Sequence, residues 1–471
     1  MTTVIIGAGV GGLSAAIALA AKGEKVVVLE TQSGAGGKLL PVNIDDMQFD
    51  SGPTVLTMAW VFDELFGLAG QSLLDHLKLL PLPTLARHYW SGGATFDLFA
   101  DQNQTIDAIG TFAGSREAEG YYAFAAASKR IHHSLMKPFL KSQRPTPWSL
   151  AASMPLREML GINPFETYWH ALGRYFKDPR LQQLFGRYAT YCGSSPFHAP
   201  ATLMLVADVE ASGVWRVEGG MAELAKALEN CARKLGVDFQ FNCKAQTIEK
   251  NGARVSAVID QDGNRHACSA VIVNADSAAL PDGLFGADVK HAAPTRAQKD
   301  QSLSAITWCA ETKEKGVPLE HHTVFFSDDY KKEFAELAHG PAHDPTVYVC
   351  DQGLGRKLLL INAPAGTKDA PQNIGHILLS RLRKSGLDLT MQKVFRRSQN
   401  DFATLYPASS GAIYGHAAHG WLSTFQRPQA RTKVEGLYLA GGTVHPGPGV
   451  PMAALSGMRA AEAIWQDRAM M

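Results

Sequence analysis

The first thirty residues carry the feature that most constrains the fold of this chain. The apolar run at 4–6 is typical of a buried strand, and Gly7-Ala8-Gly9-Val10-Gly11-Gly12 follows it with the spacing G-x-G-x-x-G. An alanine- and leucine-rich stretch at 13–22 predicts a helix, and 26–29 predicts a second strand that ends at Glu30. Strand, glycine turn, helix, strand and acid in this order predict a dinucleotide-binding unit.

The residue types of this unit suit its predicted task. Gly7 permits a tight turn, Gly9 lets the backbone approach a pyrophosphate, and Gly12 lets the helix and the strand pack closely. The helix N-terminus then faces the phosphates, and Glu30 can bind the ribose hydroxyls. This motif alone does not distinguish NAD from FAD.

Two short segments downstream bear on which dinucleotide, NAD or FAD, is bound. Gly36-Gly37-Lys38 follows Glu30 by six to eight residues, and free backbone amides beside a cation favour a second phosphate contact. Asp50-Ser51-Gly52-Pro53 then predicts a turn that leads into Thr54.

Together these segments resemble the FAD superfamily of amine oxidases, protoporphyrinogen oxidases and phytoene desaturases. The resemblance implies FAD as the cofactor and places the turn with Gly52, Pro53 and Thr54 near the flavin ring. Most members carry Arg where this chain has Lys38, which keeps the charge but not the bidentate fork.

The middle of the chain contains a coherent unit at 218–276. Its pattern predicts a helix at 221–235, a strand at 237–241, a hairpin around Asp262-Gly263 and a buried strand that ends at Asn274. The resemblance implies that this unit returns to the nucleotide domain. It also implies that backbone near Lys244-Ala245 contacts the adenine side, so Ala245 and Asn274 are candidate cofactor residues.

A last glycine-rich segment lies at 436–457. We expect a strand over 437–440 in the same sheet as the N-terminal strand, a turn at Gly441-Gly442, and a helix that begins at Met452. The N-terminus of that helix would stabilise negative charge on the reduced flavin ring. The candidate contacts are Gly441, Gly442, Gly449, Val450 and Met452.

Two further regions predict a substrate domain inserted into the nucleotide domain. Residues 96–214 carry helical signals and 286–405 alternate like half-buried strands. The expected fold is therefore α/β, a discontinuous Rossmann-like FAD-binding domain with an inserted antiparallel-sheet domain and a helical cap. The FAD-binding parts are 1–95, 215–285 and 406–471; 96–214 is the helical, membrane-facing part.

Longer stretches make the resemblance closer. The chain is similar to the bacterial carotenoid desaturases of the phytoene desaturase family, most of all to the 1-hydroxycarotenoid 3,4-desaturase (methoxyneurosporene dehydrogenase) branch. The stretches that carry this are DSGPTVLTMAWVFDELF at 50–66, LARHYW at 85–90, QLFGRYATYCGSSP at 183–196, GVWRVEGGMAELAKAL at 213–228 and YLAGGTVHPGPGVPMAALSGMRAAEAI at 438–464. The chain departs from the family's C-terminal pattern at Val444 and Pro448.

The resemblance implies an FAD-dependent enzyme that introduces a C-3,4 double bond into acyclic 1-hydroxy or 1-methoxy carotenoids, with hydride passing to flavin N5. Three other readings stay open: dehydrogenation at another carotenoid bond, oxidation of an amine or a porphyrinogen, and a lipid-binding relative without redox chemistry. Arg187, Tyr188 and Tyr191 could face the pocket or pack in the core. No general base is assigned, although several histidines titrate in a suitable range. The candidates are His132, His133, His321, His322, His416 and His419.

Composition and local patterns bear on partners and location. A formal net charge of +1 gives no nucleic-acid footprint, and six cysteines without a CxxC pair predict neither a redox disulfide nor a metal site. The uncharged start of the chain lacks a basic n-region and is interrupted by four glycines, so we expect no signal peptide and no transmembrane helix.

We expect a cytoplasmic protein attached peripherally to the cytoplasmic membrane, with a lipophilic carotenoid substrate and oxygen or a quinone as the electron acceptor. Aromatic residues of the helical part could line an apolar tunnel, meet the membrane or pack in the core. They are Tyr121, Tyr122, Phe124, Tyr168, Trp169, Tyr175 and Phe176.

Overall fold

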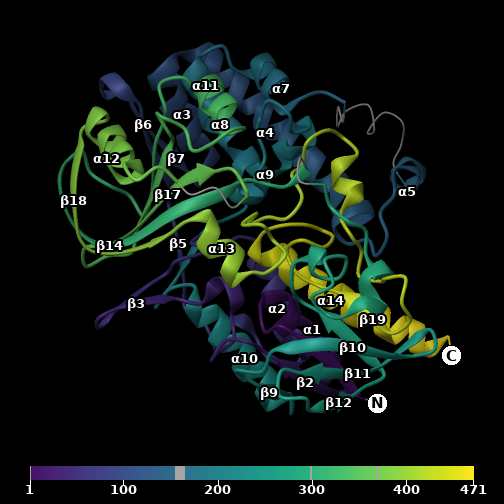
Figure 1. The fold of residues 1–471 in the computed structure, drawn as a ribbon. Helices are drawn as coiled ribbons and strands as arrows, with labels where there is room; N and C mark the ends of the chain where they lie inside the picture. Colours follow the sequence, from purple (N-terminus) through teal and green to yellow (C-terminus); the bar gives the residue numbers. More distant parts are fainter. Residues whose placement is uncertain (1, 154–164, 298–299, 367–369, 471) are drawn as a thin grey trace.

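Two β-sheets assembled from interleaved parts of the chain organise the molecule (Figure 1). The computed structural model describes residues 2–153, 165–297, 300–366 and 370–470. A five-stranded parallel sheet occupies the lower body in Figure 1, and a seven-stranded mixed sheet occupies the upper body. The predicted fold class, an α/β nucleotide domain with an antiparallel-sheet domain and a helical cap, is confirmed.

The parallel sheet has the strand order β19-β13-β1-β2-β9, and every neighbouring pair is parallel. Its strands come from three distant parts of the chain, so the nucleotide domain is discontinuous. The strands are β1 (Thr2–Ile6), β2 (Lys25–Leu29), β9 (Asp238–Gln240), β13 (Ala270–Val273) and β19 (Leu437–Leu439).

Alternating side chains of this sheet enter two different cores. Ile5 and Val28 face a helical layer, whereas Val4 and Ile6 face a small antiparallel sheet. The helices are α1 (Val10–Ala20), α2 (Ala59–Leu68), α10 (Ala222–Lys234) and α14 (Val450–Ala469), and the small sheet holds β10 (Ala245–Asn251), β11 (Arg254–Asp260) and β12 (Arg265–Ala267). Burial on both faces explains why these strands are almost uninterrupted apolar runs.

Helix α14 begins two residues earlier than the sequence predicts. It starts at Val450 rather than at Met452. Gly449 ends the preceding loop at a φ of 116°, and Pro451 fits the first turn because its missing N–H would have no partner there.

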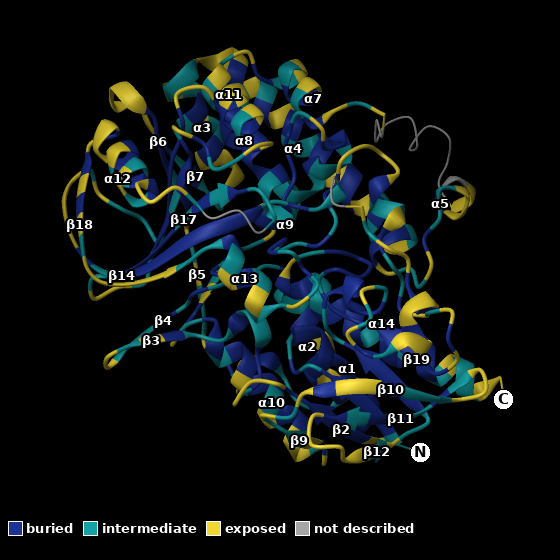
Figure 2. Ribbon diagram, viewed as in Figure 1, coloured by how far each residue is buried: buried dark blue, intermediate teal, exposed yellow. Residues whose placement is uncertain are grey.

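The second sheet has the order β18-β14-β17-β16-β15-β6-β7. β15 and β6 pair in parallel, and the other neighbours are antiparallel. Its strands are β6 (Thr84–Tyr89), β7 (Thr95–Phe99), β14 (Ser304–Gly316), β15 (His322–Phe325), β16 (Val347–Asp351), β17 (Arg356–Ala363) and β18 (Leu387–Arg397). Figure 2 shows that β14 is buried over its first half.

One expected domain boundary differs from the structure. The sequence placed residues up to 95 in the nucleotide domain, but β6 pairs with β15 and belongs to the second sheet. The physical reason is burial, because Leu85 and Phe96 of the β6–β7 hairpin pack in the core under the helical cap.

The cap covers the face of this sheet near β6, β7 and β15. It comprises α3 (Gln102–Ala113), α4 (Ser115–Leu135), α7 (Tyr168–Tyr175), α8 (Pro179–Gly186) and α9 (Leu205–Ala211), while α12 (Ile374–Lys384) packs on the other face. Tyr121, Phe124, Tyr168 and Phe176 lie in the cap core, so core packing is the correct reading of these four aromatics. The remaining elements include β3 (Val42–Ile44), β4 (Met47–Phe49), β5 (Leu79–Pro81), β8 (Trp215–Val217), α5 (Pro147–Ser153), α11 (Tyr330–Glu336) and α13 (Gln399–Leu405).

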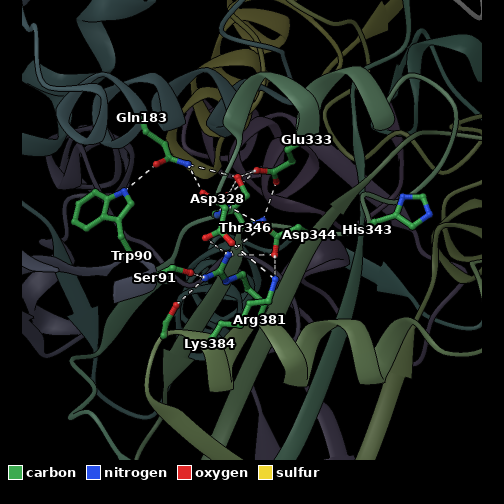
Figure 3. Close-up of polar contacts among 12 residues, drawn as sticks. Trp90, Ser91, Gln183, Asp328, Glu333, His343, Asp344, Thr346, Arg381 and Lys384 are labelled. Carbon is green, nitrogen blue, oxygen red and sulfur yellow. Dashed lines mark hydrogen bonds and ion pairs between the residues drawn. The ribbon is translucent and has the colours of Figure 1, made fainter. Parts of the chain in front are cut away.

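Buried polar contacts fasten α12 to the loops at the end of the sheet (Figure 3). The Arg381 guanidinium is buried and binds Asp328 at 2.8 Å, Asp344 at 3.1 Å and the Ser91 hydroxyl. One cation therefore ties three separate loops to one helix.

A neighbouring network in Figure 3 joins α8 of the cap to the sheet. Gln183 accepts a hydrogen bond from Trp90 Nε1 at 2.8 Å and donates to the Ser327 carbonyl at 2.9 Å. The Ser327 hydroxyl donates to Glu333 at 2.6 Å, and Glu333 also accepts from the Thr346 hydroxyl at 2.7 Å. Burial raises the pKa of Glu333 to about 7 despite these hydrogen bonds.

Candidate cofactor and substrate site

A cavity of about 1750 Å³ lies between the two sheets. The glycine turn after β1 and the segment 36–41 line one part of it. Residues of η5 (Arg187–Cys192), α9, β15, β16 and β17 line another. Ordinary small-molecule sites enclose about 300–1000 Å³, so this cavity has room for two ligands.

The turn between β1 and α1 forms one wall of the cavity. Gly7 has a φ of 98°, and a Cβ there would lie 2.7 Å from the Asn274 carbonyl oxygen. Gly7, Gly9 and Asn274 line the cavity. Gly12 does not: a Cβ there would lie closer than 3.0 Å to the Gly7 carbonyl oxygen, so this glycine packs behind the turn.

Glu30 lies at the end of β2 and holds this turn in place. Its carboxylate accepts hydrogen bonds from the Ala8 N–H at 2.6 Å and the Gln32 N–H at 2.8 Å. The same side chain lines the cavity, where its oxygens can accept from ribose hydroxyls.

Lys38 tests whether the cavity suits an anionic cofactor. Lys38 is half-buried, and its ammonium group donates to the Ile413 carbonyl at 2.5 Å and lies 5.2 Å from the ring centre of Tyr406. Burial lowers its pKa, partly offset by the negative charge of Asp276. Among the residues that the structure describes, no carboxylate makes an ion pair with it, so a bound phosphate would supply the missing counter-charge. The donor set therefore fits a pyrophosphate.

The C-terminal glycine turn meets the N-terminal turn at Asn274. A Cβ at Gly11 would lie 2.9 Å from the Cα of Gly441, and a Cβ at Gly441 would lie 3.0 Å from Asn274 Oδ1. Gly441, Gly442 and the start of α14 line the cavity, together with the other predicted contacts of this segment, which are Gly449, Val450 and Met452. A helix N-terminus thus faces the cavity beside the first turn.

The turn at Gly52 and Pro53 also reaches the cavity. A Cβ at Gly52 would lie closer than 3.0 Å to the Lys38 carbonyl oxygen, so this turn packs against the segment that is predicted to bind phosphate. Gly52, Pro53 and Thr54 line the cavity, as do Gly37, Lys38 and Ala245. The Thr54 and Tyr348 hydroxyls lie 2.7 Å apart, and Tyr348 in turn hydrogen-bonds His322 Nδ1 at 2.7 Å.

The candidate catalytic residues separate into two groups. Arg187 and Tyr191 line the cavity, whereas Tyr188 is buried behind them. The hydroxyls of both tyrosines donate to Glu210, from Tyr191 at 2.8 Å. In the described part of the chain no histidine lines the cavity, and His322 reaches it only through Tyr348.

Sequence reasoning missed several polar side chains of the cavity. They are Glu210, Tyr348, Arg397 and Arg427. Burial lowers the pKa of Arg427 to about 10, and its guanidinium donates to the Tyr414 carbonyl at 3.2 Å and to the His416 carbonyl. No local motif marks these residues, because each enters the site through contacts with distant segments.

Comparisons with known proteins agree with this geometry. Residues 10–316 match the family described as flavin containing amine oxidoreductase. The chain is 42% identical to a hydroxyneurosporene desaturase of Rubrivivax gelatinosus, over 98% of this chain and 92% of that protein. It is 29% identical to a 1-hydroxycarotenoid 3,4-desaturase of a Flavobacterium species, over 98% of both chains.

Solved structures show the same fold at low sequence identity. A putrescine oxidase superposes with a TM-score of 0.60 at 16% identity, over 99% of this chain and all of the other. An oxidoreductase from Methanosarcina mazei gives a TM-score of 0.62 at 15% identity, over 98% of this chain and all of the other. On the match to the family and the identity to its relatives, the chain belongs to the flavin-containing amine oxidoreductases, among the bacterial carotenoid desaturases, and its cofactor is FAD.

Proposed function

We propose that this protein introduces a C-3,4 double bond into acyclic carotenoids that carry a hydroxyl or a methoxyl group at C-1. The observation that carries the proposal is the single cavity that joins the predicted FAD contacts to an apolar chamber. Similarity to hydroxyneurosporene desaturases and to a 1-hydroxycarotenoid 3,4-desaturase supports this choice of substrate.

The chamber suits a long polyene. Its walls carry aliphatic and aromatic side chains from the cap, from η4 (Met136–Leu140) and from α5, and these side chains can bury a hydrocarbon chain away from water. The apolar lining residues include Leu135, Phe139, Leu140, Leu150, Leu203, Val206, Val209 and Phe425. These residues would hold the polyene in one orientation and exclude water from it.

The chain's own groups would hold the cofactor at the other end. Glu30 would bind the ribose, Lys38 and the amides of two glycine turns would bind the pyrophosphate, and the first turn of α14 would lie against the ring. When bound, the flavin would supply the hydride acceptor. The substrate would lose a hydride from C-4 to this acceptor, with the positive charge delocalised over the polyene, and the C-3 proton would be released to solvent as the new double bond forms.

Product analysis tests this function directly. Cells that make a 1-hydroxy acyclic carotenoid are given the gene, and the pigments are separated and identified. The expected product has one more conjugated double bond, at C-3,4, and absorbs at longer wavelength; a Gly12→Val variant serves as the inactive control. A double bond formed elsewhere, or unchanged pigment with turnover of an amine, would reject the proposal.

We also propose that the protein attaches to a membrane surface around the mouth of the cavity. Phe165 and Trp421 line the cavity, are 77% and 38% exposed, and pack edge to face with ring centres 5.1 Å apart. Trp148 is 85% exposed on α5, whose first residue, Pro147, lines the cavity, and exposed Lys137 and Lys141 lie on or beside η4. Aromatic side chains beside lysines favour binding at an anionic bilayer surface. Within the described ranges, no helix has both the length and the apolar character required to cross a bilayer.

Vesicle sedimentation tests the attachment. The protein is mixed with vesicles of neutral lipid alone or of neutral and anionic lipid, and the pelleted fraction is measured. A Trp148→Ser/Trp421→Ser variant is expected to lose most of its binding, whereas Tyr122→Ser, which removes an exposed aromatic outside the cavity, should bind normally. Equal binding of all three proteins would contradict the proposal. Oxygen or a quinone as the electron acceptor stays a prediction.

A further inference from the structure

Arg187 is a buried cation on the cavity wall with an unpartnered hydrogen-bond donor. It begins the 3₁₀ segment η5 (Arg187–Cys192), is 8% exposed and lines the cavity. Its Nε has no hydrogen-bond partner among the described residues. The Nε atoms of Arg296 and Arg381 also have no partner, but both of these buried side chains form ion pairs with aspartates, whereas Arg187 pairs with no described carboxylate.

Tyr191 and Glu210 compensate the charge of Arg187, and the Tyr191 hydroxyl also acts on the guanidinium through hydrogen bonding. The guanidinium lies 5.0 Å from the ring centre of Tyr191 and 5.9 Å from that of Tyr188. Glu210 is close enough to act on it electrostatically, but its two oxygens accept from the Tyr188 and Tyr191 hydroxyls. Within the described part of the chain, no carboxylate makes an ion pair with Arg187. An arginine can only donate, so the unpartnered Nε–H of this cavity-lining residue calls for an acceptor.

Arg187 lies at the deep end of the chamber rather than at its mouth. It is close enough to His88 and His322 to help keep both neutral, since burial and then the charge of Arg187 lower the pKa of His88. Tyr191 similarly acts on Tyr348, which hydrogen-bonds Thr54 on the turn expected beside the flavin ring. The mouth residues Phe165 and Trp421 are much more exposed.

We propose that Arg187 determines substrate specificity by donating a hydrogen bond to the oxygen at C-1 of the carotenoid. This inference rests on the proposed function, because C-1 lies within about 4 Å of C-3 and C-4 at ordinary bond lengths. The oxygen must therefore find its partner close to the reacting carbons, while the rest of the polyene extends toward the mouth. A hydroxyl and a methoxyl oxygen both accept, whereas a hydrocarbon of the same length leaves the guanidinium unpaired.

Binding and turnover of two matched carotenoids test the inference. One is a 1-hydroxy acyclic carotenoid and the other is its counterpart without the hydroxyl. Dissociation constants come from quenching of tryptophan fluorescence, and kcat/KM comes from product formation. We expect the holoenzyme to prefer the hydroxylated compound by about 10- to 100-fold.

Three variants separate a specificity role from a structural one. Arg187→Met should bind the hydroxylated compound more weakly and the hydrocarbon more tightly, which brings the ratio of dissociation constants to within about threefold of one. Arg187→Lys keeps a charged donor and should restore part of the preference. Arg180→Met, on the neighbouring helix α8, removes an arginine that pairs with Asp178 outside the cavity and should leave the ratio unchanged.

Each result decides the question. An equal loss for both compounds in Arg187→Met, or no preference in the unchanged protein, overturns the role of Arg187. If Arg187→Met does not fold, the ratio for the unchanged protein and for Arg187→Lys decides instead. If the protein binds the hydroxylated compound more tightly but desaturates neither compound, the proposed function is wrong, whereas the role of Arg187 in binding the oxygen is supported.

Discussion

Two cations on the cavity wall illustrate what single residues contribute to the site. Lys38 lines the part predicted to bind phosphate and Arg187 lines the deep apolar part, and neither forms an ion pair with a described carboxylate. A cation held away from water without an ion-pair partner costs stability, so each is better explained by a ligand than by folding. Removing either cation should therefore weaken ligand binding without lowering the stability of the ligand-free protein.

Lys38→Met is therefore expected to weaken FAD binding without weakening the fold. Removing the counter-charge of the pyrophosphate should raise the dissociation constant for FAD by about 10- to 100-fold. The apoprotein should unfold at the same temperature or higher, because a charge without an ion-pair partner is lost. FAD titration and thermal unfolding of the apoprotein measure the two effects. Lys38→Arg is the charge-conserving control, and a less stable apoprotein with normal FAD affinity would contradict the prediction.

Glu333 predicts a pH dependence of stability. Its pKa rises from 4.5 to about 7 in the folded protein because of burial, so the folded state keeps a proton that the unfolded state has released. The free energy of unfolding that this proton contributes is largest near pH 4.5 and falls as the pH rises to 7, by on the order of 3 kcal/mol. Glu333→Gln should remove this fall.

Urea unfolding at pH 5, 6 and 7 checks the prediction. The free energy of unfolding of the parent protein minus that of Glu333→Gln should decrease as the pH rises. Glu336→Gln on the same helix is the control, because the His343 N–H lowers the pKa of Glu336 and any slope should have the opposite sign. A difference that stays constant or grows with pH would refute the assignment.

At the scale of elements, the contact between α1 and α14 fixes the position of the two turns. A Cβ at Gly457 of α14 would lie closer than 3.0 Å to the Gly11 carbonyl oxygen and 2.9 Å from the Ala15 amide nitrogen. The first turn of α1 and the body of α14 therefore touch through backbone. The start of α14 faces the cavity only while this close approach is kept.

Gly457→Ala is expected to push the two helices apart. Overpacking of a tight contact costs about 1–3 kcal/mol, and a shift of α14 should also lower the flavin content per chain. Gly67→Ala in α2 is the matched control, since no atom lies within 4 Å of a Cβ there and the helix should gain up to about 1 kcal/mol. Chemical unfolding and flavin absorbance distinguish the two outcomes; equal stability of both variants would be evidence against the tight contact.

Elements also differ in how far the sequence predicts them. The strand–turn–helix units at β1 and β19 carry local signals, namely apolar runs followed by glycines. The sequence predicts both units, and the start of α14 differs from its predicted position by two residues. The sequence assigns β6 to the nucleotide domain and so separates it from β7, because the partner strand β15 lies more than 200 residues away from β6. Glu210 and Tyr348 enter the cavity through similarly distant contacts, which no single-sequence pattern encodes.

At the scale of the whole molecule, elements of both sheets line the cavity, so a ligand bound in the cavity should stabilise both sheets against unfolding. FAD that binds only the folded state should raise the free energy of unfolding, by about 4 kcal/mol at a thousandfold excess over its dissociation constant. We expect one unfolding transition whose midpoint rises with FAD concentration, followed by fluorescence from both halves of the molecule. Two transitions, of which FAD shifts only one, would show that the two sheets unfold independently.

The interleaved parallel sheet also has a consequence for synthesis on the ribosome. β1 pairs with β13 and β13 with β19, yet Leu437 leaves the ribosome 431 residues after Ile6. At about 5–20 residues per second, the first strand waits roughly 20 to 90 seconds before the last one arrives. From the synthesis of Val273 until that of Leu437, 164 residues later, β13 has an open edge, and the loop at 440–449 that lines the cavity does not yet exist. The nascent chain therefore depends on protection of that edge, for example by a chaperone, until its last strand has been made.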